Sequence, residues 1–183
     1  NHNAGNFLLT FLSNHTGGDF PAAVQALGEI LKIQGRVVPV TIDKVTLVAE
    51  LTNGEHVYGE RAIDTRRKKG HVGIKRVMLV PHHGSIAVYP PVIEALKKAH
   101  HIIVGPGDLF TSIIPNFLVR EVARAVEKNK KARYLYIMNL LTKYGETHDF
   151  MADDFLKTIS YYVQRRFDTV LMNEKKPSRE LMQ

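Results

Sequence analysis

The sequence contains no cysteine among its 183 residues. This absence excludes a disulfide framework, a zinc site built from thiolates and a cysteine nucleophile. A chain without cysteine fits a reducing compartment, so we expect a cytoplasmic protein. The amino-terminus lacks the basic and then apolar pattern of a secretory signal. It also lacks an initiator methionine, so we expect further residues upstream.

Long hydrophobic runs are absent as well. Apolar stretches such as 102–104 and 135–138 fall far short of the roughly 18 residues that a membrane-spanning helix needs. Hydrophobic residues make up 44% of the chain and charged residues 23%, as in ordinary globular domains. The length suffices for one hydrophobic core. We therefore expect a single domain over residues 1–183 and no membrane span.

Acidic residues are in the minority, with 18 Asp and Glu against 25 Lys and Arg and a net charge of +7. Such an excess raises the question of a polyanionic partner. The basic residues are scattered, however, and the one dense run, Arg66–Lys69, has no aromatic residues interleaved with it as a single-strand-binding surface would. Nucleic acid is therefore disfavoured as a partner. A nucleic-acid or protein-docking module that uses this run is our third hypothesis for function.

The first third of the chain predicts two helices and then a small β element. Asn6 can cap a helix over 7–12, and Asp19 followed by Pro21 is typical of the start of another, which we expect to run to Lys32. Three strands are expected next. They cover residues 37–40, 45–51 and 56–59, with a hairpin turn at 53–54. Residues 61–73 are charged and predict a mobile surface loop, so 35–73 forms a β-hairpin and loop element.

From residue 75 onward, short apolar strands alternate with amphipathic helices. The expected strands are 75–80, 101–104, 133–138 and 169–172, and the expected helices are 91–99, 112–129 and 151–164. This alternation predicts the α/β class, with a mostly parallel sheet and helices on both faces. Ligands bind outside the carboxyl ends of such strands. The strand-to-helix loops are rich in glycine, hydroxyl and carboxyl groups, whereas the opposite loops are mostly lysine, so function belongs at the first edge.

The most informative loop is Gly105–Ser112, which leaves a buried strand and enters a long helix. Free backbone amides and the positive end of the helix dipole favour an anion there, with phosphate as the obvious guest. The glycines allow close approach, and Thr111 or Ser112 can cap the helix or bind an oxygen. Asp108 would repel a bare phosphate unless Mg²⁺ or a sugar hydroxyl lies between them. The alternative is a plain tight turn before a capped helix.

A second polar loop, 139–149, follows the next strand and is longer than such connections usually are. Asn139 at the strand end can hold a ligand amide or ribose, and Thr142, Glu146 and Thr147 add hydroxyl and carboxylate groups. The alternative is that the loop only starts the next helix, with Asp149 as its cap.

Nine histidines raise the question of a metal site. The adjacent pairs His82-His83 and His100-His101 point to opposite sides of an extended chain, so neither pair readily chelates one ion. No helical zinc motif occurs, and no strained GxSxG elbow supports a serine hydrolase. A ligand contact from His82 or His83 remains open because both follow a strand at the functional edge.

Five motifs occur in order along the chain and together resemble one known family. They are Gly5–Leu9, Gly35–Thr41, Gly59-Glu60, Gly105–Asn116 and Gly145–Thr147. The combination is similar to the YvcK-type gluconeogenesis factors of the CofD-like superfamily, over nearly the whole chain, and the block 105–116 is highly specific. The resemblance implies a Rossmann-like α/β fold in a longer protein. Its glycine-rich nucleotide-binding segment would precede this sequence, so we expect that portion to be missing.

The resemblance also implies two functions. The first is a UDP-sugar-binding regulator of gluconeogenic growth, cell shape and cell-wall metabolism, with a UDP-sugar or another nucleotide diphosphate as its ligand. The alternative is a Mg²⁺-dependent phosphotransferase that resembles 2-phospho-L-lactate transferase, and Mg²⁺ bound with the diphosphate is the only cofactor we expect. We also expect a homo-oligomer.

The residues that match the family pattern at the ligand crevice can be carried over one by one. They are Asn6, Gly105, Gly107, Thr111, Ser112, Asn139, Thr142, Gly145, Glu146 and Thr147. We also expect Asp108, which lies in the same loop, to contact the ligand. Two charged residues depart from the pattern. Asp108 stands where many relatives have serine, and Lys143 ends a Leu-Thr-Lys run where relatives have Met-Thr-Gln. Both change the charge at the edge of the expected site.

Overall fold

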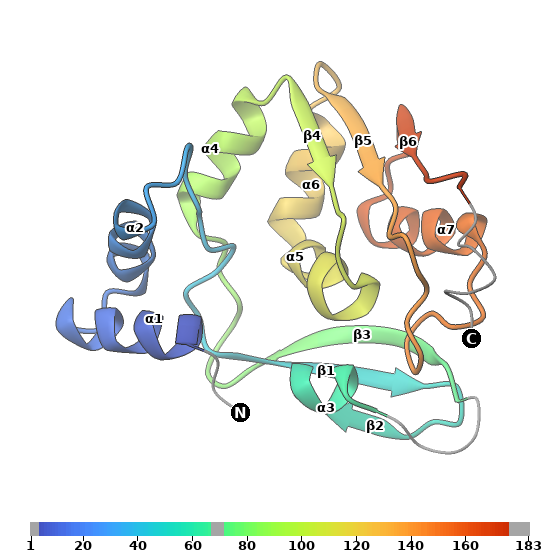
Figure 1. Ribbon diagram of the computed structural model, residues 1–183, viewed down its shortest axis with the longest axis horizontal. Coiled ribbons are helices and arrows are strands. Elements are labelled where there is room, and N and C mark those ends of the chain that lie inside the picture. The colour runs from blue at the N-terminus through green and yellow to red at the C-terminus, as the bar shows by residue number, and fades with distance from the viewer. Residues whose placement is uncertain (1–3, 67–71, 176–183) are drawn as a thin grey trace.

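Two three-stranded sheets organise the computed structural model, which describes residues 4–66 and 72–175 (Figure 1). The first sheet is antiparallel, with the order β2-β1-β3, and the second is parallel, with the order β4-β5-β6. Their strands are β1 (Val45–Leu51), β2 (His56–Tyr58), β3 (Ile74–Pro81), β4 (His101–Val104), β5 (Arg133–Ile137) and β6 (Thr169–Leu171). The predicted α/β class is therefore confirmed, with a small antiparallel sheet beside the parallel one.

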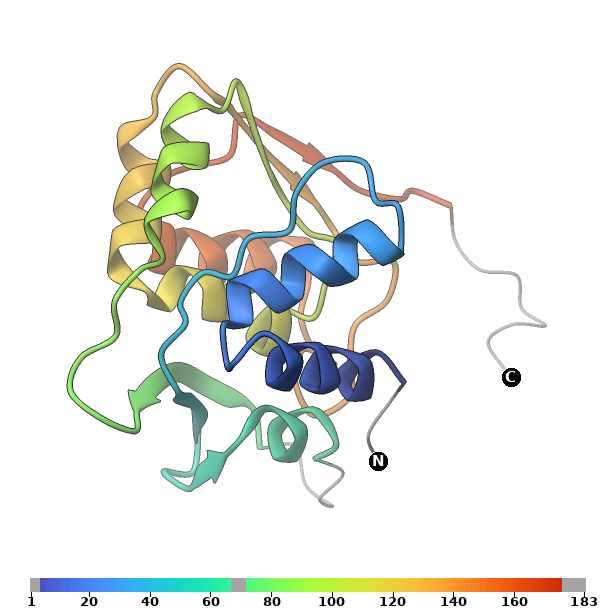
Figure 2. The same ribbon diagram turned by 90° about the vertical axis from the view of Figure 1, so that its left-hand side faces the viewer.

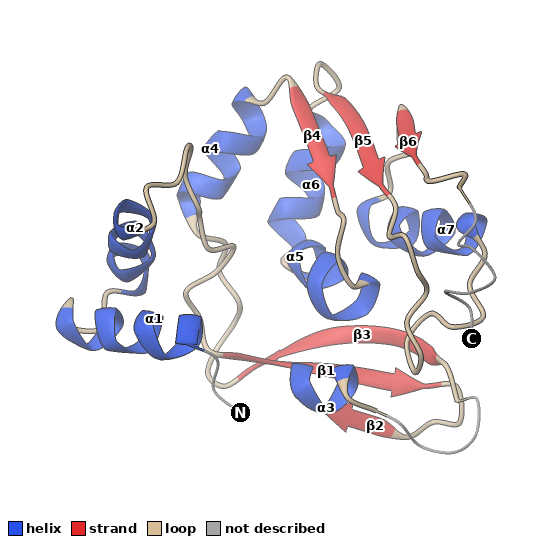
Figure 3. Cartoon of the chain, viewed as in Figure 1, coloured by secondary structure: helices blue, strands red, loops and turns tan. Residues whose placement is uncertain are grey.

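Seven α-helices and one π-helical turn accompany the sheets in the described part of the chain (Figure 3). They are α1 (Ala4–His15), α2 (Phe20–Ile30), α3 (Glu60–Asp64), α4 (Pro90–Lys98), the π-helical η1 (Leu109–Ile113), α5 (Ile114–Leu118), α6 (Arg120–Lys128) and α7 (Ala152–Val163). Asp19 caps α2 as predicted, because its side chain accepts a hydrogen bond from the amide of Ala22. Among the described residues, no helix combines the length and the apolar character that crossing a membrane requires.

Strand β3 corrects one prediction. The alternating pattern after residue 75 assigned it to the parallel sheet, but it pairs antiparallel with β1, from Val45 opposite Pro81 to Leu51 opposite Ile74. Residues 47–51 of β1 are all buried, so β1 is a central strand that needs a partner on each edge. The hairpin strand β2 supplies one partner and β3 the other. A strand's own pattern does not specify which neighbour it pairs with.

The parallel sheet is covered by helices on one face. Because its strands follow one another in chain order, two right-handed crossovers place α6 and α7 on the same side (Figure 2). Tyr134 and Tyr136 are fully buried on that side, whereas Ile103 is 58% exposed and Leu171 52% exposed on the other. We predicted helices on both faces of the parallel sheet. Within the described residues, helices cover one face.

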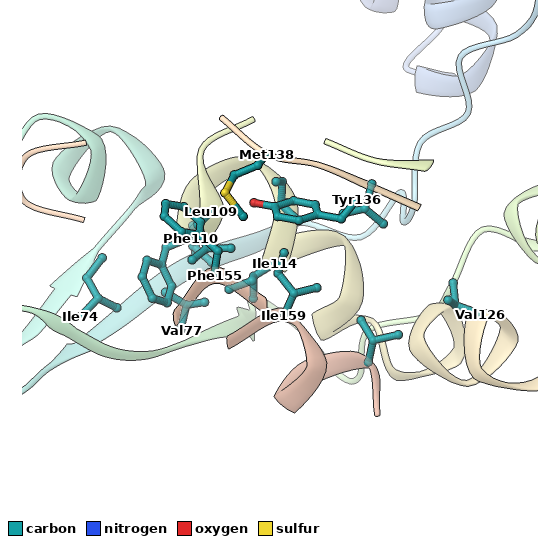
Figure 4. Packing of buried hydrophobic residues seen from close by; sticks show 14 of the residues in the cluster. Ile74, Val77, Leu109, Phe110, Ile114, Val126, Tyr136, Met138, Phe155 and Ile159 are labelled. Carbon is teal, nitrogen blue, oxygen red and sulfur yellow. The ribbon is translucent and has the colours of Figure 1, made fainter. Parts of the chain in front are cut away.

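The hydrophobic core lies where η1 and α5 are held between the two sheets. Phe110 of η1 packs edge to face against Phe150, which packs in the same way against Phe155 of α7. Figure 4 shows Phe110 and Phe155 with Met138, Leu109 and Ile159 near them. The segment that follows the glycine loop is therefore anchored firmly in the core.

The predicted long helix 112–129 starts earlier and is broken. Its first turns are η1 and α5, and α6 begins only after Val119, whose backbone is extended at φ −76° and ψ 102°. This break buries Val119 with Val92 and Val122 in a second small core. The gain in buried apolar area offsets the interrupted helical hydrogen bonding.

Two predictions in the β element are also corrected. Residues 37–40 do not form a strand, although the carbonyl of Val40 accepts a hydrogen bond from the amide of Tyr89 at 2.8 Å. The predicted mobile loop 61–73 contains most of α3, which is held by the buried Ile63. Residues 67–71 of that loop lie outside the described residues. They include most of the basic run 66–69.

Candidate functional site

The two polar loops meet at the carboxyl ends of β4 and β5. The amide of Gly107 donates a hydrogen bond to Oδ1 of Asn139 at 2.9 Å, so the loops are joined directly. Gly105 makes this approach possible. Its φ is +84°, and a Cβ at this position would lie 2.4 Å from the carbonyl oxygen of Ile137. Only glycine fits a positive φ this close to neighbouring backbone.

The start of η1 is occupied by a carboxylate from the chain itself. Glu146, whose side chain is 1% exposed, accepts hydrogen bonds at 3.3 Å from the amide of Phe110 and from the hydroxyl of Thr111. A carboxylate is favoured at this position because the helix dipole is positive there. The amides of Ser112 and Ile113 donate to the carbonyl of Asp108. The amides that we predicted would hold an anion therefore have acceptors within the protein at these three positions.

One ammonium group lies among three carboxylates at this edge. The Nζ of Lys143 is 2.6 Å from Oδ2 of Asp108 and 3.1 Å from Oε1 of Glu146, and it also pairs with Oδ1 of Asp64. One carboxylate oxygen from each acid lies within 4.8 Å of the others. We call these four residues the Lys143 cluster. Its Lys143–Asp108 pair joins two of the positions that depart from the pattern of the resembled family.

Burial and charge shift the pKa values within the Lys143 cluster. Burial raises the pKa of Glu146 and outweighs the opposing effect of Lys143, with the nearby charge of Asp108 adding to the increase. Burial lowers the pKa of Lys143, but its hydrogen bonds to Asp108, Asp64 and Glu146 more than compensate, and its pKa is raised overall. Lys143 therefore remains a cation at physiological pH, and its charge is shared by three acids.

The second loop is closed by a tight turn against α3. The amide of Lys143 donates to the hydroxyl of Thr147 at 3.0 Å, and the amide of Thr147 donates to the carbonyl of Lys143 at 2.8 Å. Gly145, with φ +83°, lies between them, and a Cβ there would be 2.6 Å from the carbonyl oxygen of Arg66. Nη2 of Arg66 donates to the carbonyl of Gly145 at 2.5 Å. The loop conformation thus depends on the segment at the end of α3.

Most of the predicted site residues come together at this edge. The residues that contact one another there, or that shape the two loops, are Gly105, Gly107, Asp108, Thr111, Asn139, Gly145, Glu146 and Thr147. Ser112 and Thr142 are exposed. Asn6 is exposed in the first turn of α1, and its place in the site stays a prediction.

Asp64 and Arg66 were not predicted as part of the site. Both were assigned to a surface loop, and each contacts a residue 79 positions away in the sequence. A charged stretch offers no local signal for such a contact.

Asp149 was expected as the cap of the following helix, but the carboxylate of Asp154 accepts a hydrogen bond from the amide of Met151 instead. Asp149 pairs with His148 at 2.9 Å.

Oxygen ligands for a metal ion are present in the Lys143 cluster. Within the described residues, Asp64, Asp108 and Glu146 form the one group of three or more potential ligands with close donor atoms. Carboxylate oxygens are the ligands that Mg²⁺ prefers. The donor type therefore fits Mg²⁺, although Lys143 already contacts all three acids.

His82, which the sequence left open as a ligand contact, is exposed, and its Nε2 lies 2.9 Å from the hydroxyl of Thr46.

A groove in the described part of the chain lies elsewhere. It has a volume of about 990 Å³ and runs between α2 and residues 35–42, with Phe20, Val24 and Tyr89 among its lining residues. None of the predicted site residues lines it. The three carboxylates and the ammonium of the Lys143 cluster lie instead at the carboxyl edge of the parallel sheet.

Comparison with known proteins places this geometry in a family. A family model described as 2-phospho-L-lactate transferase CofD matches residues 1–183. The chain belongs to the CofD family. It is 38% identical over 182 residues to a protein from Listeria innocua and 37% identical over 175 residues to one from Bacillus subtilis, both named gluconeogenesis factor. These matches cover 99% and 95% of this chain but only 54% and 53% of the relatives.

A solved structure agrees with the fold. The crystal structure of a UPF0052-family protein from Bacillus halodurans has a TM-score of 0.85 to this chain at 32% sequence identity. The alignment covers 97% of this chain and 55% of that protein. The chain therefore spans about half the length of the CofD-family relatives that it matches.

Proposed function

We propose that this CofD-family chain forms part of a nucleotide-sugar site and that the protein acts as a regulator of gluconeogenic growth, cell shape and cell-wall metabolism. The observation that carries the proposal is the hydrogen bond between the amide of Gly107 and Asn139, because it unites the loops after β4 and β5 into one polar edge. Ligands of open parallel sheets bind outside this edge. The names of the relatives support the gluconeogenic role.

The charges at the edge indicate how a nucleotide sugar would lie. Three carboxylates and one ammonium in the Lys143 cluster leave an excess of negative charge, which repels phosphate and attracts hydroxyl groups as hydrogen-bond donors. We therefore assign ribose or sugar hydroxyls to Asp108 and to the exposed Thr142, with Asn139 beside them. The diphosphate would lie farther from the Lys143 cluster, within reach of the exposed hydroxyl of Ser112.

Thermal unfolding with UDP-N-acetylglucosamine tests the proposal. A ligand present at 100 times its Kd stabilises the folded state by about 2.7 kcal/mol, and we expect a corresponding rise in Tm. Asn139→Ala should remove most of this rise, because it breaks the connection between the loops, whereas Lys157→Met on the exposed surface of α7 should keep it. If no UDP-sugar raises the Tm of the wild-type protein, the proposal is wrong.

A Mg²⁺-dependent phosphotransferase is the second candidate, and the three carboxylates of the Lys143 cluster favour it. Asp64, Asp108 and Glu146 would hold the ion, which would polarise phosphate oxygens and offset their charge. The protein's own groups would position the donor, with Asn139 and Thr142 at the rim. Release of a nucleoside monophosphate that requires Mg²⁺ and is lost in Asp108→Ala would support this function over simple binding.

A further inference from the structure

Lys143 connects three separate parts of the molecule. Asp64 belongs to α3 beside the antiparallel sheet, Asp108 to the loop after β4, and Glu146 to the loop after β5. The Lys143 side chain is 29% exposed, whereas those of Lys75 and Lys157 in other ion pairs are 60% and 72% exposed. Its ammonium group is therefore partly buried and less exposed than in those surface pairs.

Glu146 needs this cation in order to stay where it is. A buried carboxylate is costly unless hydrogen bonds and an opposite charge compensate it. Two hydrogen bonds come from the start of η1, through Phe110 and Thr111, and the charge comes from Lys143. Without Lys143, Asp64 and Asp108 would repel Glu146 at close range, since the donor oxygens of all three acids lie within 4.8 Å.

We propose that Lys143 is a positioning residue that locks α3 and the two loops into one rigid edge by holding Glu146 on the start of η1. Where Glu146 is ionised, loss of the Lys143 charge leaves this buried carboxylate uncompensated, so its hydrogen bond from the amide of Phe110 opens more often and α3 loosens. This inference goes beyond the proposed function, because it concerns the protein without ligand and holds whichever ligand the edge binds.

Amide hydrogen exchange measured by NMR on the protein without ligand tests the proposal. Exchange of the Phe110 amide reports opening of its hydrogen bond to Glu146. We expect Lys143→Met to speed this exchange at least tenfold and Lys143→Arg, which keeps the charge, to change it less than threefold. Lys157→Met is the matched control, because it breaks the exposed pair with Asp153, and it should leave the Phe110 amide unchanged.

A charge-removal rescue separates an electrostatic role from a packing role. In the double variant Lys143→Met/Glu146→Gln, the neutral amide of glutamine can still accept from Phe110 but carries no charge to compensate. We expect its Phe110 exchange rate to return to within threefold of the wild-type rate. The proposal is overturned if Lys143→Met exchanges within threefold of wild type, if Lys143→Arg is as fast as Lys143→Met, or if the double variant shows no rescue.

A milder variant keeps the test available if Lys143→Met does not fold. Asp64→Ala removes only the connection to α3, and its side chain is partly exposed. We expect the amide of Thr65, which donates to the carbonyl of Arg61 at the end of α3, to exchange at least fivefold faster. An unchanged Thr65 amide in Asp64→Ala would contradict the lock. Because no ligand is present, these outcomes do not depend on whether UDP-sugars bind.

Discussion

At the scale of single residues, glycines and one lysine shape the candidate site. Gly105 and Gly145 have positive φ and approach the backbone of Ile137 and Arg66, so each marks a place where two segments touch. Both glycines belong to the motifs 105–116 and 145–147. The role of Lys143 as the partner of three acids depends on contacts with residues that are far apart in the sequence.

We expect Gly145→Ala to lower the free energy of unfolding by more than the cost of placing an alanine at a positive φ. A Cβ there lies 2.6 Å from the carbonyl oxygen of Arg66, and overpacking of this kind typically costs roughly 1–3 kcal/mol. Gly54→Ala is the control, since its φ of +86° is similar and nothing lies within 4 Å, so only the backbone cost of about 1 kcal/mol remains. Urea unfolding measures both, and equal effects of the two variants would contradict the close contact.

At the scale of elements, local periodicity predicted where helices and strands lie along the chain better than it predicted which strands pair. The parallel strands and α7 lie within a few residues of their predicted bounds. The break at Val119 and the antiparallel partner of β3 were missed, because both depend on burial against distant segments.

A separate feature, Arg165, fixes the end of α6. This residue is 8% exposed, and its guanidinium donates to the carbonyls of Val126, Asn129 and Ala132.

Arg165→Met should release the end of α6 from the turn that follows α7. Three carbonyls lose charge-assisted hydrogen bonds, and we expect the free energy of unfolding to fall by about 3 kcal/mol. Arg166→Met is the matched control at the exposed neighbouring position, where surface changes usually stay within about 0.5 kcal/mol. Chemical denaturation of both variants provides the measurement. A small effect of Arg165→Met would show that the carbonyls find other donors.

At the scale of the whole molecule, the parallel sheet has an exposed apolar face. Ile103 and Leu171 are more than half exposed, and the strand registers put both on the face opposite the buried Tyr134 and Tyr136. Purely parallel sheets are normally covered on both faces, and β4 and β6 are its edge strands among the described elements. Exposed apolar patches of this kind favour association, so this face is where we expect copies of the chain to meet in the predicted homo-oligomer.

Ile103→Lys should therefore weaken self-association of the chain. We expect the association constant from analytical ultracentrifugation to fall at least tenfold, which corresponds to about 1.4 kcal/mol. Leu31→Lys is the control, because Leu31 is similarly exposed at 63% but follows α2, away from the sheet. If both substitutions have the same effect, the open face of the sheet is not the surface through which the copies associate.

The sequence by itself determined the class of the fold and the two loops at which polar chemistry gathers. Helical and strand periodicity are local properties, and glycines with hydroxyl and carboxyl residues after apolar strands identify the polar edge of the sheet from short stretches alone. Only the tertiary structure decided that β3 pairs with β1, that helices cover one face of the parallel sheet, and that Glu146 rather than a ligand meets the start of η1. It also brought Asp64 to Lys143 across 79 positions. The physical reason is that burial and ion pairing depend on which segments pack together, and charged residues in a sequence do not specify their partners.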